Sequence, residues 1–191
     1  MSRAALLLLV CLPLLAACGE EPDAPPAVFK VKAPRGEKVE EFPQAGMTLT
    51  RPKNWRLRRR DAPGVFELAS GEAIIAGWAY PRDEPLPDSD ADMEAAKARL
   101  VGAIHERNPD YRVRSAAVTE IAGAPAIDVE GDQVLSKRPL RTRSVHLFLG
   151  DVEYVIEAIA PPADFALTEE RVMVPLLDSL EVTGEVTEDA G

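Results

Sequence analysis

Histidine and serine are the residue types in this 191-residue chain that first suggest catalysis. His105 lies in a helical pattern with no metal-binding residue four positions before or after it, so no helical metal pair forms. His146 alternates with the apolar residues of a strand pattern. Ser70 lies in LASGE, which lacks the glycine two positions earlier that a nucleophile elbow requires. We therefore expect structural roles for both histidines, no catalytic residues, and no metal or other cofactor.

A short acidic stretch suggests calcium binding. Asp88, Asp90 and Asp92 have the spacing of the first three ligands of an EF-hand loop. However, Met93 stands where the loop needs glycine, and Arg99 stands where it needs a bidentate glutamate. We interpret these acids instead as residues at the N-terminus of a helix, where negative charge is favourable.

Two basic runs stand out in a chain with a formal net charge of −10. The first, RPKNWRLRRRD, places Arg56, Arg58 and Arg60 on one face if it is extended. The second, SKRPLRTR, contains Lys137, Arg138, Arg141 and Arg143. One interpretation is that these charges protect edge strands from pairing with other chains. The other is a surface that binds an acidic protein, a lipid headgroup or a cell-wall polymer. The overall acidity argues against nucleic acid as a partner.

The N-terminus predicts where the protein resides. Residues 4–15 form an apolar segment of the length typical of a secretory signal and too short to span a bilayer. The following Leu-Ala-Ala-Cys18 resembles the bacterial lipobox. In such lipoproteins the cysteine receives a diacylglyceride, the chain is cut before it, and the new amine is often acylated, which gives stable anchoring. The resemblance implies a mature protein anchored through Cys18 on the extracytoplasmic face of a bacterial membrane. An ordinary cleavage site beside a cysteine is the alternative.

Composition divides the chain into four segments. Residues 1–17 form the predicted signal peptide, and residues 18–40 comprise the lipidated cysteine and a tether rich in proline and charge. Residues 41–183 form one domain, and residues 184–191 form an acidic tail that we expect to be disordered. The pattern leaves open whether residues 28–32 form a strand.

Hydrophobic patterns within the domain predict strands, a helix, further strands and a second helix. A strand covers residues 47–50, and three hairpins turn near Ser70-Gly71, Ala122-Gly123 and Gly150-Asp151. A helix begins near Asp90 and presents one apolar stripe, which contains Met93, Ala96, Leu100, Val101 and Ile104. The segment TEERVMVPLLDSLEV is helical, with Pro175 expected to kink it or to mark a late start. This order predicts an α+β fold with an antiparallel sheet packed by helices.

Four segments between residues 45 and 182 resemble the PsbP-like fold group: GMTLTRPKNW, VTEIAGAPAIDVEG, GDVEYVIEAIAPPADF and VPLLDSLEV. That group includes the extrinsic photosystem II protein, a Ran-binding nuclear import factor and many bacterial lipoproteins. The resemblance implies an α/β/α sandwich and a role in binding or assembly rather than catalysis. We therefore expect a membrane-anchored, non-enzymatic binding or assembly module with an envelope protein or cell-wall partner. The alternative is a carrier that holds a small molecule or metabolite in a pocket between the sheet and a helix.

Overall fold

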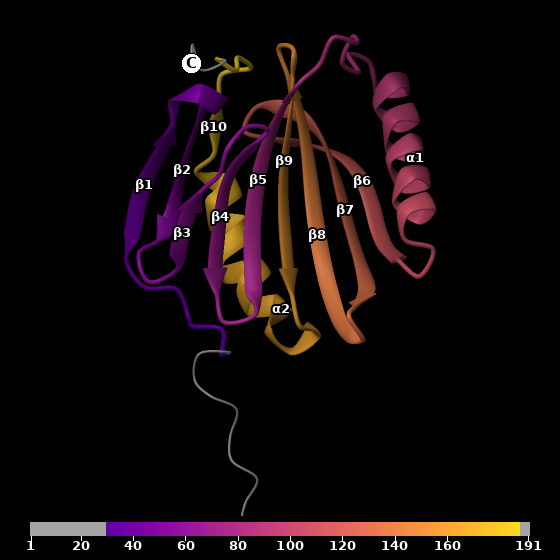
Figure 1. Cartoon of the computed structure of the whole chain (residues 1–191). Coiled ribbons are helices and arrows are strands. Elements are labelled where there is room, and N and C mark those ends of the chain that lie inside the picture. The colour runs from indigo at the N-terminus through magenta and orange to yellow at the C-terminus, as the bar shows by residue number, and fades with distance from the viewer. Residues whose placement is uncertain (1–29, 188–191) are drawn as a thin grey trace, which may run out of the picture.

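A computed structural model describes residues 30–187 (Figure 1). Cys18 and the predicted signal peptide lie outside the described residues. Two antiparallel sheets and two helical segments make up the fold, which confirms the predicted α+β class. The smaller sheet has the order β1-β2-β10 and consists of β1 (Glu37–Phe42), β2 (Met47–Pro52) and β10 (Glu181–Val182). A 3-10 turn, η2 (Pro43–Ala45), joins β1 to β2.

The larger sheet has the order β3-β4-β5-β9-β8-β7-β6, with every neighbouring pair antiparallel. Its strands are β3 (Arg56–Arg59), β4 (Gly64–Ser70), β5 (Ala73–Pro81), β6 (Arg112–Ile121), β7 (Ala124–Leu135), β8 (Arg138–Leu149) and β9 (Val152–Ala160). Strands β3–β5 form one meander and strands β6–β9 form another. The chain crosses to the far edge through α1 and returns, so the two meanders meet where β9 pairs with β5. All three predicted hairpins are present.

Helix α1 (Asp90–Arg107) covers one face of the sheet over β6 and β7. It begins where the sequence predicts, because the Ser89 hydroxyl accepts a hydrogen bond from the Asp92 backbone N–H at 3.2 Å and caps the helix. Met93 is buried against Ile127 and Val129, which makes a small second core. The predicted stripe faces this core, except that Val101 is not among the residues packed against it.

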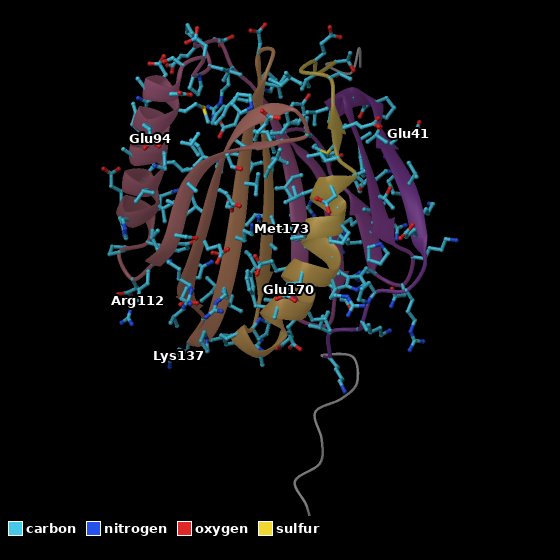
Figure 2. All side chains as sticks on the ribbon, turned by 180° about the vertical axis from the view of Figure 1, so that it is seen from behind. Glu41, Glu94, Arg112, Lys137, Glu170 and Met173 are labelled. Carbon is cyan, nitrogen blue, oxygen red and sulfur yellow. The ribbon has the colours of Figure 1, made fainter. Side chains whose placement is uncertain are left out.

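The opposite face of the large sheet packs against the C-terminal helical segment and the small sheet (Figure 2). This segment runs through α2 (Pro162–Thr168), a π-helical turn η3 (Glu169–Met173) and α3 (Val174–Asp178). The helix begins earlier than predicted, because a proline at a first helical position lacks only an N–H that would have no partner there. The π turn ends at Met173, two positions before Pro175. This local change in hydrogen bonding accommodates the proline that the sequence predicts will disturb the helix.

Both borders of the domain differ from the sequence-based expectation. Residues 37–40, expected in the tether, belong to β1, and Val31 is buried in the main core. Residues 184–187, expected in the disordered tail, are docked. The Gly184 N–H donates to the Tyr154 hydroxyl at 3.2 Å, and the Thr187 N–H donates to the Gln44 carbonyl at 2.9 Å. The ordered domain therefore extends further at both ends than hydrophobic periodicity indicates.

Among the described residues, no helix is long and apolar enough to cross a membrane.

Candidate ligand-binding groove

The first basic run forms an edge strand. Strand β3 ends the larger sheet, and Arg56 and Arg58 are exposed on it. Arg60 lies just beyond β3, 3.8 Å from Glu67, which faces Arg58 in the neighbouring strand. Arg59 instead packs over the Phe42 ring with its guanidinium 4.6 Å from the ring centre. The charged side chains on β3 are therefore placed to protect the sheet edge from pairing with another chain. Arg56 and Arg58 also remain available to bind an anion.

The second basic run does not form one free patch. Arg141 binds Asp132 at 2.9 Å, and Arg138 is paired with Glu72. Arg143 binds Asp128 at 2.7 Å and Glu169 at 3.1 Å, so it ties β7 and β8 to the C-terminal helical segment. Within the described residues, Lys137 alone of this run has no ion pair. An anion at this run would therefore compete with carboxylates that already hold three arginines.

A groove that the sequence does not predict in detail lies between α1 and the large sheet. Two hollows of about 250 Å³ and 450 Å³ lie along it, and both are lined by Leu100 and His146. Aromatic side chains of β5 and aliphatic side chains of α1 form its apolar walls. These residues are Trp78, Tyr80, Leu100 and Ile104. Polar groups of β8 and β9 form its floor, which gives the combination of apolar walls and convergent polar groups typical of ligand sites.

Three side chains on the floor form a hydrogen-bonded row. The His146 Nδ1 lies 2.7 Å from the Glu153 Oε1, and its Nε2 lies 3.0 Å from the Ser144 hydroxyl. Arg82 also binds Glu153. Burial disfavours the charge on Glu153, but the hydrogen bonds from His146 and Arg82 outweigh it and lower the pKa of this carboxyl below its usual range. An ionised carboxylate only accepts hydrogen bonds, so His146 donates from Nδ1 and, when neutral, accepts from Ser144 at Nε2.

This serine–histidine–glutamate row has the connectivity of a hydrolytic triad but not its setting. Ser144 lies in the middle of β8, which is paired on both sides, with β7 and β9. The backbone N–H groups around Ser144 therefore face neighbouring strands rather than a reacting oxygen. An acyl-transfer site needs donors directed at the developing oxyanion. The row is better suited to fixing the Ser144 hydroxyl, whose oxygen lone pairs remain able to accept from a ligand.

Glu157 lies directly opposite Ser144 in the β8–β9 register and lines the larger hollow. Burial raises the pKa of this carboxyl, and the nearby basic side chains of His146 and Arg107 offset only part of the effect. No residue of the described chain donates a hydrogen bond to Glu157 or forms an ion pair with it. A half-buried carboxylate that is raised in pKa and lines a hollow is a candidate functional residue.

Part of this site follows from the predicted turn at Gly150-Asp151. A two-residue turn fixes the register, which pairs Phe148 with Glu153 and Ser144 with Glu157. The face of β8 that carries His146 therefore also carries Ser144, as alternation requires. The sequence does not indicate that α1 covers this face and turns it into a groove.

Comparison with solved structures identifies the fold. The chain aligns with the PsbP protein of the cyanobacterium Synechocystis with a TM-score of 0.59 and 7% identity, over 77% of this chain and 92% of that one. LpqN of Mycobacterium tuberculosis, involved in cell envelope biogenesis, aligns with a TM-score of 0.55 and 12% identity, over 78% and 91%. The yeast Ran-binding protein Mog1p aligns with a TM-score of 0.54 and 10% identity, over 78% and 96%.

No protein-family model matches the sequence, and no curated protein matches it. The structural alignments show that the chain has the PsbP-like fold that its sequence segments predict.

Proposed function

We propose that this protein is a non-enzymatic, lipid-anchored binding module on the extracytoplasmic face of a bacterial membrane, and that the groove under α1 binds a small organic amine. The lipobox-like Cys18 supports the location. Similarity of fold to LpqN, a protein of cell envelope biogenesis, is consistent with it. Of the two functions that the sequence suggests, the groove favours a small-molecule carrier with its pocket between sheet and helix.

The observation that carries this proposal is the unpartnered carboxylate of Glu157 in the groove. A ligand ammonium group would supply the missing hydrogen-bond donor and a closer positive charge than Arg107 provides. The Ser144 oxygen, held by His146, offers a second acceptor beside it. The ring of Trp78 lines the same hollow, and aromatic rings attract cations. An apolar body on the amine would lie against Leu100 and Ile104 of α1.

The prediction is that the protein binds hexylamine and that Glu157→Gln weakens this binding at least tenfold, which is about 1.4 kcal/mol. Trp78 lines the groove whereas Trp55 is 1% exposed, so intrinsic fluorescence reports a ligand at Trp78. Affinity is expected to fall as the pH is lowered through the raised pKa of Glu157, because the protonated acid no longer attracts a cation. Titrations with hexylamine over a range of pH measure both effects.

Matched ligands and variants control this experiment. Hexanol has the same apolar body without the charge and is expected to bind more weakly, whereas hexanoate is expected not to bind. Glu67→Gln removes a carboxylate from β4 that does not line either hollow, and this variant should bind hexylamine normally. Glu157→Gln should fold at least as stably as the original chain, because it removes a charge that burial disfavours and that accepts no hydrogen bond. Equal binding of hexylamine by both variants would contradict the proposal.

Replacing Cys18 with serine is expected to abolish lipid attachment and processing before this residue, because the thiol is the proposed attachment point. Intact-mass analysis of the protein purified from bacterial membranes measures the attached lipid directly. An unmodified Cys18 in the original chain would show that the anchoring part of the proposal is wrong, and it would leave the groove untouched.

A further inference from the structure

Charge is segregated between the two ends of the domain. Because the strands are antiparallel, their connections fall at two opposite ends. We call the end at which the described chain begins, at Lys30, the anchor end (Figure 1). The connections there carry basic residues that form no ion pair with another described residue: Lys30, Lys32, Arg35, Lys53 and Lys137. They also carry two acids, Asp110 and Glu72, and Glu72 is already paired with Arg138.

The opposite, distal end is acidic. Its connections carry Asp61, Asp83, Glu84, Asp88, Asp151 and Glu185. They carry two arginines, Arg60 and Arg82, and both are paired with glutamates of the sheet. Figure 2 shows Lys137 and Arg112 at the lower edge and Glu41 and Glu94 in the upper half, with the helical residue Glu170 between them in the lower half. Although the net charge of the chain is −10, the connections at the anchor end carry more basic than acidic residues.

Exposed aliphatic side chains also gather at the anchor end. Large hydrophobic residues with high exposure are few in the described chain, and three of them are Val134, Leu135 and Ile74, with exposed fractions of 58%, 59% and 39%. Val134 and Leu135 end β7 directly before the tight turn to β8, and Ile74 lies near the start of β5. Aliphatic residues beside lysines are the composition that enters the headgroup region of a bilayer.

We propose that the anchor end rests on an anionic bilayer, with the β7–β8 turn in the headgroup region and the basic connections around it. The proposal deepens the proposed function, because it defines how the anchored domain is oriented. Eleven residues lie between Cys18 and Lys30, so even a fully extended chain spans only about 40 Å. The tether joins the domain at the anchor end, and the basic and aliphatic residues there, rather than the tether length, favour contact of this end with the membrane.

The acidic distal end does not prevent this contact. A strand such as β8, with 12 residues, spans about 40 Å along the domain. Exposed charges are screened within about 10 Å at an ionic strength of about 0.1 M. Repulsion between the lipid surface and the distal acids is consequently weak, whereas the basic residues at the surface are attracted. The orientation that the proposal assigns keeps the acidic end away from the membrane.

The test uses the chain from residue 19 onwards, which lacks Cys18 and retains every residue of both hydrophobic cores. Its association with vesicles reports the protein surface without a lipid anchor. We expect it to co-sediment with vesicles that contain 30% phosphatidylglycerol in phosphatidylcholine at 0.1 M salt. It should not co-sediment with pure phosphatidylcholine vesicles or at 0.5 M salt. Changing Lys32 and Lys53 to glutamine should lower partitioning about fivefold for each lysine lost.

Matched controls locate the contact. Lys97→Gln makes the same charge change on α1, away from the anchor end, and should leave partitioning unchanged. The chain contains no cysteine after residue 18, so a polarity-sensitive fluorophore can be placed on Ser136→Cys or on Ala122→Cys. Both positions lie in tight turns with similar positive φ, of 51° and 54°, at opposite ends of the domain. Only the label at position 136 is expected to shift to shorter wavelength on anionic vesicles.

The outcomes separate this proposal from the anchoring proposal. Lack of vesicle binding, equal binding to both kinds of vesicle, or equal shifts at positions 122 and 136 would overturn it, whatever the mass analysis finds at Cys18. An unmodified Cys18 together with a shift at position 136 alone would overturn anchoring and leave the membrane-facing surface intact. Circular dichroism of each labelled or substituted chain confirms that the fold is retained.

Discussion

Replacing Arg51 with methionine is expected to lower the free energy of unfolding by about 3 kcal/mol, at the lower end of the range for breaking a buried ion pair. Arg51 and Glu40 are 9% and 5% exposed, and the Arg51 Nη2 lies 2.7 Å from the Glu40 Oε1. Arg51 also donates to the carbonyls of Pro52 and Trp55 at 3.0 Å and 3.1 Å. The methionine would leave the Glu40 carboxylate buried with only the more exposed Lys38 and Arg59 as partners. Urea denaturation at neutral pH measures the loss.

The pH dependence of stability provides the control. Burial disfavours the charge on Glu40, but hydrogen bonds from Lys38 and Arg51 outweigh it and lower the pKa of this carboxyl. The stabilisation is therefore present above the ordinary glutamate pKa and is lost as the pH falls through the lowered value.

The double variant Arg51→Met, Glu40→Leu should recover much of the lost stability, because no charge then remains unpaired. A loss below about 1 kcal/mol in the single variant would contradict the expected role of Arg51.

The Leu176→Ala variant should lose about 2 to 5 kcal/mol of stability, the range for truncating a packed leucine. Leu176 is fully buried on α3, where it belongs to the main core. Leu177 is 6% exposed in the same core, and its truncation should cost a comparable amount. Asp178→Ala, at an exposed position of the same helix, serves as the control and should be nearly neutral. Losses well under about 1 kcal/mol at both leucines would mean that the helical segment is not docked in solution.

Local signals predicted most of the large sheet and both helical segments. The hairpin turns contain glycines with positive φ, such as Gly71 and Gly123, so turn chemistry located the strand ends. The stripe on α1 and the cap at Ser89 located the helix in the same way. These features depend on residues close together in the sequence, which explains why they are visible without a structure.

Strand β1 was missed for a physical reason. Its sequence, EKVEEF, offers little apolar alternation, and Val39 is 59% exposed. The burial of Glu40 in this strand depends on Arg51, which is eleven positions away in the chain and directly available only once β1 pairs with β2. When a charged residue is buried only because of a partner in another strand, its sequence pattern predicts a solvent-exposed linker instead of a strand.

Part of the candidate groove could likewise be predicted from the sequence, and part could not. Alternation and the Gly150-Asp151 turn place Ser144, Glu153 and Glu157 on the face of His146. Two other parts of the groove arise only from the tertiary fold. Helix α1 packs over that face, and Trp78 comes from β5, which lies far from β8 in the sequence. Sequence reasoning that treats His146 by itself therefore assigns a structural role and overlooks the hydrogen-bonded row.

The pairing of β5 with β9 has a consequence for biogenesis. During synthesis from the N-terminus, β3–β5 and β6–β8 emerge as two separate blocks with unsatisfied edges, and neither is complete until residues 152–160 follow. The small sheet closes later still, when residues 181–182 pair with β2. Such late closure delays cooperative folding until almost the whole domain has left the ribosome. We expect this delay to keep the nascent chain unfolded, which is the state that the secretory channel of the proposed export route would accept.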